Sequence, residues 1–386
     1  MRPVLASLFF VALAACKPVA QSESNRTTAA EDEARSTPTG LRFLGGEVED
    51  GFRRATQPID LVFPRDHGSH DEFRNEWWYF TGNVAASSGR EFGFELTFFR
   101  IGLAPHGGDE QRGSAWRADQ VWMAHFAITD VQNGRLIATE RLARGALGLA
   151  GAAAAPFRVW VEDWSVTGLA DERSCALVLL AQDGQIAASL DLEAVKPVAV
   201  HGERGLDAKG PEPGNASYYY SFPRLDVRGW MLVDGTRSDV TGSAWMDREW
   251  STSALSPGIV GWQWFGLQLS DGRELMLYGL RQADGTLSAY SGGSLIGVDG
   301  STTRLGRADI ELAATRYWTS PRTRARYPVS WQITIPAAAL TLTVEPRVSD
   351  QEINLSVRYW EGSVRVTGQG HDGPLTGRGY LELAGY

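Results

Sequence analysis

Lysine is scarce in this chain of 386 residues. Only Lys17, Lys196 and Lys209 occur, and the other 34 of the 37 basic residues are arginine. Chemistry that passes through a lysine Schiff base therefore has very few candidate residues. Cysteine is also rare, since Cys16 and Cys175 are the only two.

Excess positive charge and long hydrophobic runs are missing as well. The formal net charge is -9, which makes a nucleic acid an unfavourable partner. With 43% apolar and 22% charged residues, the chain is neither disordered, nor a collagen, nor a polytopic membrane protein. At 386 residues it is long enough for two domains.

The amino terminus is typical of a bacterial lipoprotein. Arg2 precedes an apolar stretch, residues 4–15, which is too short to span a bilayer as a helix. It ends in Leu-Ala-Ala before Cys16, so we expect a signal peptide over residues 1–15 and lipidation of the Cys16 thiol. The alternative is an ordinary secreted protein in which this cysteine is incidental.

The segment after Cys16 determines the expected location. Residues 16–55 begin with a part rich in Ser, Thr, Ala, Glu and Pro, which indicates a flexible tether. Lys17 follows the lipidation site and favours the outer membrane, so we expect an anchored protein that faces the periplasm. Cys175 is then the only unmodified cysteine, without a partner for an intrachain disulfide, and we expect it to be a small buried residue.

Strict alternation of apolar and polar residues dominates the remainder of the chain. Residues 91–98 read Glu-Phe-Gly-Phe-Glu-Leu-Thr-Phe, and residues 331–335, 340–345 and 353–359 alternate in the same way. This period of two predicts strands with one buried face. Asn-Gly and Asp-Gly pairs, for example Asn133-Gly134, separate the segments and favour hairpin turns. We therefore predict an antiparallel all-β protein.

A loose internal repeat predicts two related domains. Residues 78–82 resemble residues 264–266, and residues 240–247 resemble residues 375–382. We interpret the halves as two β-barrels in tandem, closed so that no long strand edge is exposed, over residues 56–250 and 251–386. The 14 tryptophans suggest aromatic-lined interiors. The additional residues of the first half are assigned to residues 101–121 and 196–217.

Three clusters are candidates for chemistry. In the first, His67 and His70 lie between Asp66 and Asp71, a pattern that could ligate a metal or simply form a polar loop that faces a substrate. A third metal ligand is not evident, so we predict neither a metal nor a cofactor.

The second cluster is Trp245-Met-Asp247-Arg-Glu249-Trp250. A carboxyl among aromatic rings loses solvation, which raises its pKa and suits it to donate a proton. Tryptophan faces can stabilise a carbocation. The alternative is an ion-paired strand end that joins the two domains.

The third cluster is a run of three tyrosines. On a strand, Tyr218 and Tyr220 share one face and could line a ligand pocket or a plain barrel wall. The nearby Ser217 and Ser221 lack a Gly-x-Ser-x-Gly setting, which argues against a serine hydrolase.

Five stretches together resemble the family of carotenoid 1,2-hydratases (hydroxyneurosporene synthases) and AttH-like proteins. They are residues 63–68, 76–82, 123–130, 214–221 and 245–251. The resemblance covers about residues 58–386 and implies two lipocalin-like β-barrel domains. It also implies either acid-catalysed hydration or cyclisation of an isoprenoid-like double bond, or partnership with an ABC-type exporter. Arg248, Glu249 and Leu280 stand where the hydratases tend to have His, Asn and Asp, which argues against carotenoid hydration.

Two functions follow as alternatives. The first is an envelope lipoprotein that binds an apolar lipid or isoprenoid ligand inside a barrel. The second is a hydro-lyase or cyclase in which Asp247 donates the proton. The catalytic candidates are Asp247, Glu249, His67 and Glu76. The candidate ligand-binding residues are Trp78, His125, Tyr218, Tyr220, Trp245 and Trp250.

Overall fold

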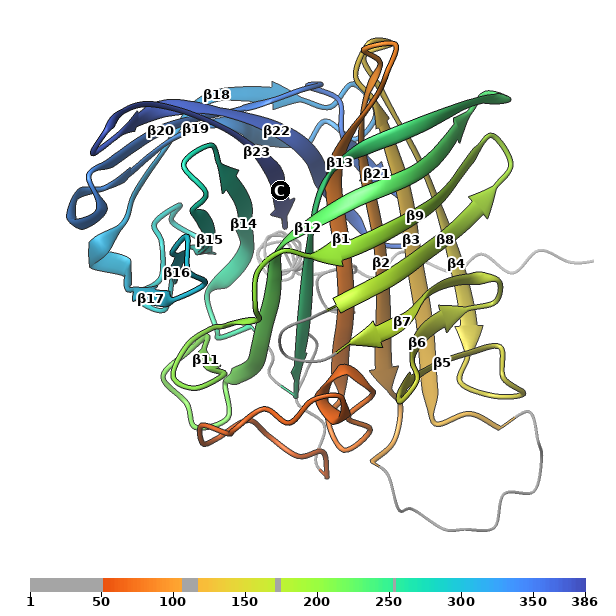
Figure 1. Cartoon of the computed structure of the whole chain (residues 1–386). Coiled ribbons are helices and arrows are strands. Elements are labelled where there is room, and N and C mark those ends of the chain that lie inside the picture. The colour runs from red at the N-terminus through yellow and green to blue at the C-terminus, as the bar shows by residue number, and fades with distance from the viewer. Residues whose placement is uncertain (1–50, 106–116, 171–174, 253–254) are drawn as a thin grey trace, which may run out of the picture. The chain divides into compact units, whose positions relative to one another are not determined.

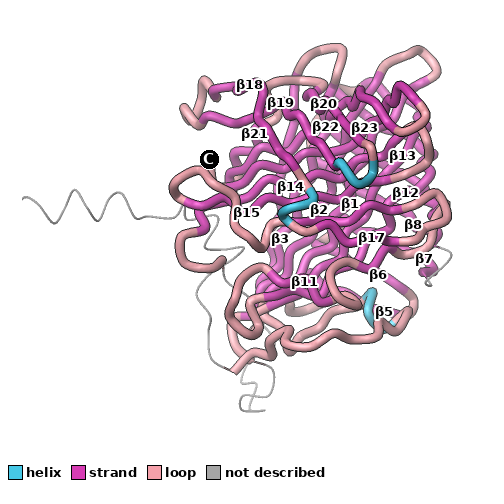
Figure 2. Tube along the Cα trace, turned by 90° about the vertical axis from the view of Figure 1, so that its left-hand side faces the viewer, coloured by secondary structure: helices cyan, strands magenta, loops and turns pink. Residues whose placement is uncertain are grey.

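The computed structural model describes residues 51–105, 117–170, 175–252 and 255–386, without the side chains of residues 169, 170 and 175. All of them belong to one compact unit, residues 38–386. Strands make up almost all of its regular structure (Figure 2). The described helices are three short 3₁₀ turns, η1 (Arg65–His67), η2 (Arg307–Asp309) and η3 (Pro336–Ala338).

The first half of the chain forms one antiparallel sheet (Figure 1). In spatial order its strands are β4 (Arg135–Arg144), β3 (Gln120–Asp130), β2 (Glu91–Gly102), β1 (Asn75–Ala86), β13 (Thr236–Ser251), β12 (Ala216–Val233), β9 (Ile186–Ala194), β8 (Cys175–Asp183), β7 (Trp164–Ala170), β6 (Phe157–Val161) and β5 (Ala150–Ala154). The short strands β10 (Ala199–Val200) and β11 (Leu206–Ala208) pair with β12.

The second half forms another antiparallel sheet. Its spatial order is β17 (Thr302–Leu305), β16 (Gly292–Ile296), β15 (Glu274–Gln282), β14 (Ile259–Leu269), β23 (Gly373–Ala384), β22 (Arg358–Gly370), β20 (Leu340–Pro346), β19 (Arg326–Ile335) and β18 (Glu311–Thr319). The short strand β21 (Glu352–Asn354) pairs with β22. The change of sheet falls between Ser251 and Ile259, and the predicted domain limits 56–250 and 251–386 stay a prediction.

The two sheets have equivalent strand orders, which confirms the predicted all-β class and explains the internal repeat. β1 and β2 occupy the same positions as β14 and β15, and β13 corresponds to β23. The first sheet also contains the β5–β6 hairpin, so its additional residues are not confined to the two stretches expected from the sequence. Among the described strands no ladder joins β4 to β5 or β17 to β18. Each sheet is thus barrel or half-barrel shaped rather than closed by a continuous ladder.

Each sheet has a hydrophobic core of its own on one face. The first core contains Trp78, Phe80, Phe94 and Trp164, all at or near 0% exposure. The second contains Phe265, Leu267, Val329 and Trp360. These side chains come from alternate strand positions, so the period of two in the sequence does specify which residues fill the two interiors.

Two further clusters contain residues from both sheets. One combines Tyr79 and Tyr219 of the first sheet with Trp264 of the second, and the other combines Phe99 with Tyr359. Hydrogen bonds also cross between the sheets, such as that from the Tyr79 hydroxyl to Glu361 at 2.7 Å. The halves therefore share an interface that is both apolar and hydrogen-bonded.

Gly93 permits close approach of the sheets at this interface. A Cβ at this position of β2 would lie 2.6 Å from the Tyr380 hydroxyl and 2.7 Å from the Ser363 Cβ, both in the second sheet. In the part of the chain that the structure covers, no helix is long and apolar enough to span a membrane.

Candidate active site

Neighbouring residues of the central strands face opposite environments. In β1, Trp78 and Phe80 belong to the first core, whereas Trp77 and Tyr79 belong to the clusters between the sheets. The same holds in β12, where Tyr218 and Tyr220 lie in the first core and Tyr219 faces the second sheet. Since side chains alternate along a strand, the odd-numbered residues of these strands form the wall of the inter-sheet space.

A cavity of about 160 Å³ lies in this space. Its lining residues come from both sheets and include Trp77, Tyr79, Glu95, Tyr219, Asp247, Glu249, Trp262, Trp264, Tyr278, Tyr359 and Glu382, with Lys209 from the loop before β12. The sequence predicts a ligand inside a barrel. The cavity instead lies between the two sheets, because large aromatic and aliphatic side chains fill the two cores.

Asp247 of β13 is held by three donors. The Tyr219 hydroxyl donates to Oδ2 at 2.7 Å, the Trp245 indole donates to Oδ1 at 2.6 Å, and Ser221 also donates to Oδ1. These donors stabilise the carboxylate, but burial outweighs them and raises the pKa of Asp247 to about 7. The group can therefore both accept and release a proton near neutral pH.

Glu95 of β2 is a second buried acid in the cavity wall. Its Oε1 accepts hydrogen bonds from Thr97 and Tyr359, both at 2.8 Å. Its Oε2 is buried and has no hydrogen-bond partner among the described residues. Burial raises the pKa of Glu95 to about 8, so the carboxyl is mostly protonated at pH 7.

A third acid, Glu382 of β23, comes from the other sheet. It accepts a hydrogen bond from the Trp262 indole at 2.6 Å, and burial raises its pKa to about 7. Glu361 is also buried close to the cavity wall. Its charge adds to the effect of burial in raising the pKa values of Tyr79 and Tyr359. The cavity wall thus contains carboxyl groups that are mostly or about half protonated at pH 7.

Lys209 supplies positive charge to one part of the wall. Its Nζ lies 2.6 Å from Asp207 and 3.6 Å from Glu249, and 3.9 Å from the centre of the Tyr278 ring. Burial alone would lower the pKa of Lys209, but the two carboxylates raise it above its ordinary value. This lysine therefore stays charged, and Glu249 faces a cation that Asp247 lacks.

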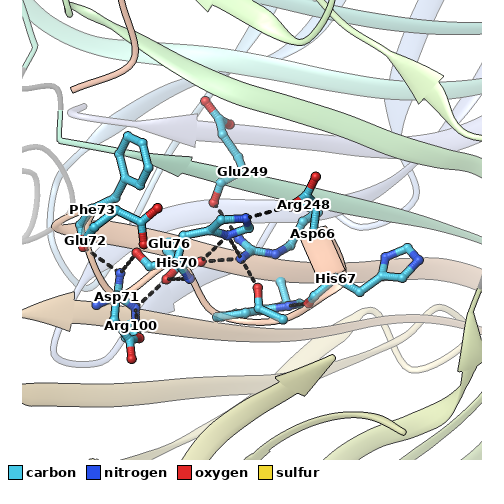
Figure 3. A network of polar contacts seen from close by, with 12 residues as sticks. Asp66, His67, His70, Asp71, Glu72, Phe73, Glu76, Arg100, Arg248 and Glu249 are labelled. Carbon is cyan, nitrogen blue, oxygen red and sulfur yellow. Dashed lines mark hydrogen bonds and ion pairs between the residues drawn. The ribbon is translucent and has the colours of Figure 1, made fainter. Parts of the chain in front are cut away.

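Of the catalytic candidates, Asp247 and Glu249 line the cavity, and Trp245 binds Asp247 directly. Glu76 lies elsewhere, in a polar network at the end of the first core (Figure 3). It accepts hydrogen bonds from Arg100 at 2.5 Å and from Arg248. Although burial opposes it, these two guanidinium groups hold the pKa of Glu76 well below its ordinary range.

His67 and His70 contact protein groups rather than each other. His67 Nδ1 lies 2.6 Å from the Tyr220 hydroxyl, and the His70 ring stacks on Trp250 with 3.9 Å between centroids. His70 also bonds to Glu76 and Asp66. Within the described ranges, no group of three or more His, Cys, Asp or Glu side chains is arranged to hold a metal ion.

The structure does not bring the ligand-binding candidates together in the cavity. Trp78, Tyr218, Tyr220 and Trp250 belong to the first core. His125 is fully buried behind the cavity wall, where its Nδ1 lies 2.7 Å from the Tyr359 hydroxyl. Cys16 lies outside the described residues, as does the side chain of Cys175.

Sequence reasoning missed Glu95, Tyr219 and Glu382. A signal was present for Glu95, because it alternates with Phe94 and Leu96 in residues 91–98 and so had to face away from that core. The run of three tyrosines gave an equally clear choice of faces, but the sequence alone did not show that the face with a single tyrosine meets a second sheet.

The fold and the cavity define a class of two-sheet β-proteins that hold acids and aromatic rings between their sheets. Within that class the sequence profile of the AttH-like family matches residues 54–386, and the chain belongs to this family. No curated protein matches the chain.

The solved structures that are similar to this chain include the following three. A candidate AttH from Nitrosomonas europaea is 33% identical, with a TM-score of 0.76 over 87% of this chain and 100% of its own. Kievitone hydratase from Nectria haematococca has a TM-score of 0.65 at 13% identity, over 87% of this chain and 98% of its own. CghA has a TM-score of 0.51 at 14% identity, over 89% of this chain and 97% of its own. The last two structures show only that their fold is similar to that of this chain.

Proposed function

We propose that the protein binds an apolar small molecule between its two sheets and acts on it by acid–base catalysis, as a hydro-lyase or cyclase. The observation that carries this proposal is the raised pKa of three carboxyls, Glu95, Asp247 and Glu382, in one aromatic cavity. Enzymes tune carboxyls toward the working pH by burial, and perturbed acids in a cavity favour a catalytic site. The hydratase among the structures of similar fold is consistent with this chemistry.

Glu95 is the better proton donor of the cavity. Its neutral form prevails at pH 7, and its side chain lines the cavity, where the carboxyl can give a proton to a ligand carbon. Protonation of a carbon–carbon double bond leaves a carbocation, and the rings of Trp77, Trp262 and Trp264 in the wall can stabilise it.

Asp247 suits the role of base. In a hydration, water adds to the cation and loses one proton, which the Asp247 carboxylate can accept because its pKa is about 7. In a cyclisation or isomerisation the proton would leave from carbon instead. Asp247 was the proton donor expected from the sequence, but the three hydrogen-bond donors around its carboxylate favour Glu95 for that step.

A binding module without turnover is the second candidate. It is favoured by the lipoprotein-type amino terminus, since a tethered carrier at the envelope needs a cavity but no catalyst. We include in this candidate the anchor on Cys16, the periplasm-facing location and an ABC-type exporter as partner.

The test compares binding with turnover. The mature protein is incubated in D₂O with linear isoprenoid alkenes of increasing length, and products are analysed for added water or carbon-bound deuterium by mass spectrometry. We expect incorporation that Glu95→Gln abolishes. If the alkenes displace the bound apolar dye anilinonaphthalene sulfonate but take up neither water nor deuterium, the result supports the binding module instead. Leu280→Trp, which fills the cavity, should abolish both, whereas Val178→Trp on the exposed face of β8 should abolish neither.

A further inference from the structure

A chain of polar groups connects the buried Glu95 with the protein surface. From Glu95 Oε1 it passes to the Tyr359 hydroxyl at 2.8 Å and then to His125 Nδ1 at 2.7 Å. His125 Nε2 faces Glu140 Oε2 at 3.7 Å. The Glu140 side chain is 24% exposed, whereas the His125 side chain is fully buried.

The sheet geometry sets up this sequence of groups. His125 of β3 is paired with Thr97 of β2 on one side and with Glu140 of β4 on the other. Glu95, two residues before Thr97, lies on the same face, and Tyr359 reaches in from β22 of the second sheet. The polar groups therefore step outward across three adjacent strands, from the cavity wall to the end strand of the sheet.

We propose that Tyr359, His125 and Glu140, the relay residues, carry protons between solvent and Glu95. The relay itself does not depend on the proposed function. Only the use of the Glu95 proton in catalysis rests on that function. A hydration that takes a proton from Glu95 and returns one to Asp247 leaves Glu95 ionised, so each turnover needs a proton to re-enter at Glu95.

The transfer balances with a single proton. A proton that Glu140 has taken from solvent passes to His125 Nε2, and Nδ1 releases its own proton to the Tyr359 oxygen. The Tyr359 hydroxyl passes its proton to the Glu95 carboxylate. One proton has then entered at Glu140 and one has arrived at Glu95, and the imidazole has changed tautomer. In the reverse direction, the same groups release a proton to solvent.

The groups around the relay are suited to transfer. Burial lowers the pKa of His125, so its ring is neutral at pH 7 and can accept a proton at Nε2, which has no hydrogen-bond partner in the described residues. Glu140 is held by the amide and hydroxyl of Ser356 at 3.0–3.2 Å, and the facing His125 ring lowers the pKa of Glu140.

Two carboxyls of the second sheet influence the inner end of the path, and the aromatic ring of Phe99 packs on His125 with 5.5 Å between the ring centroids. Glu95 is influenced by Glu382 of β23, which raises its pKa, and it raises the pKa of Glu361 on β22. Both carboxyls come from the second sheet, and within the described part of the chain neither forms a hydrogen bond to His125 or Glu140.

The test follows the exchange of the Glu95 proton and needs no substrate. The infrared C=O stretch of protonated Glu95 is identified as the band that Glu95→Gln removes. The wild-type protein is mixed rapidly with D₂O, and the shift of this band is timed. In His125→Gln, which keeps a polar side chain but cannot titrate, we expect exchange slower on the order of a hundredfold. Glu140→Gln, at a partly exposed site, should also slow it, and His371→Gln on the surface should not.

Unchanged exchange in both His125→Gln and Glu140→Gln would overturn the relay, because Glu95 would then exchange through the cavity. If His125→Gln does not fold, Glu140→Gln decides alone. If exchange is slower in these variants but the wild-type protein turns over no alkene, the relay is supported and the proposed function is wrong. If the wild-type protein turns over an alkene but exchange is unchanged in the variants, the proposed function is supported and the relay is wrong.

Discussion

The Tyr219 hydroxyl donates a hydrogen bond to Asp247 Oδ2 at 2.7 Å and at the same time accepts one from the Trp264 indole at 3.0 Å. One phenol thus joins an acid of the first sheet to an aromatic ring of the second. Because a donor to a carboxylate favours its charged form, Tyr219 keeps the pKa of Asp247 lower than burial alone would make it.

Removing that hydroxyl should change the titration of Asp247. We expect Tyr219→Phe to raise the pKa of Asp247 above about 7, as measured by NMR or infrared titration of the carboxyl. Tyr218→Phe is the matched control, since the neighbouring Tyr218 hydroxyl donates to the Gln57 carbonyl on the other face. Equal titration curves in the two variants would contradict the assigned contact.

Stability should fall as the pH rises through the neutral range. The native state holds Glu95 protonated up to about pH 8, whereas the ordinary pKa is 4.5. Between these values the unfolded chain releases the proton that the native state keeps, so native stability falls as the pH rises. Glu95 alone contributes a decrease on the order of 5 kcal/mol across this window. Urea unfolding from pH 5 to pH 9 measures it, and Glu95→Gln should flatten the curve. An unchanged slope in that variant would show that Glu95 is ionised at neutral pH.

The polar network at the end of the first core should be essential to stability. Glu76→Gln leaves Arg100 and Arg248 buried without their carboxylate, and breaking such a pair costs about 3–5 kcal/mol. The matched control is Glu345→Gln, which removes an exposed ion pair with Arg365 and should cost no more than about 1 kcal/mol. Similar denaturation midpoints for both variants would mean that the network contributes little.

Filling the cavity should separate binding from folding. Leu280→Trp enlarges a side chain that lines the cavity, so we expect dye binding to be lost while the unfolding free energy changes by less than about 3 kcal/mol. Phe265→Ala in the second core should show the reverse, with a loss of about 3–5 kcal/mol. Dye binding that survives Leu280→Trp would place the ligand outside the inter-sheet cavity.

Lipidation is tested in a bacterial host. Cells expressing the full chain are labelled with radioactive palmitate, and we expect label in the wild type and none in Cys16→Ser. Fractionation should find the wild-type protein in the envelope and release the variant. Cys175→Ser is the control that keeps the expected anchor.

Much of the fold was accessible from the sequence. Alternation in residues 91–98 and 340–345 predicted strands that β2 and β20 confirm. The similarity of residues 78–82 to residues 264–266 predicted a duplicated unit, and β1 and β14 indeed hold equivalent places in the two sheets. These inferences succeed because the period of two and internal similarity are properties of the chain itself.

The site was predicted only in part. Asp247 and Glu249 do line the cavity, but Trp78, Tyr218, Tyr220 and Trp250 face the first core. For Tyr218 and Tyr220 the sequence left open a ligand pocket or a plain barrel wall, and in the structure their face packs into the filled first core.

The sequence by itself determined that the chain is an antiparallel β-protein with a repeated unit, and that certain side chains must share a strand face. Only the tertiary structure decided which face meets the other sheet. That choice depends on contacts between residues as distant as Glu95 and Tyr359, or Tyr79 and Glu361. Burial at such an interface raises the pKa of an otherwise ordinary glutamate, and no local pattern in the chain encodes that loss of solvent.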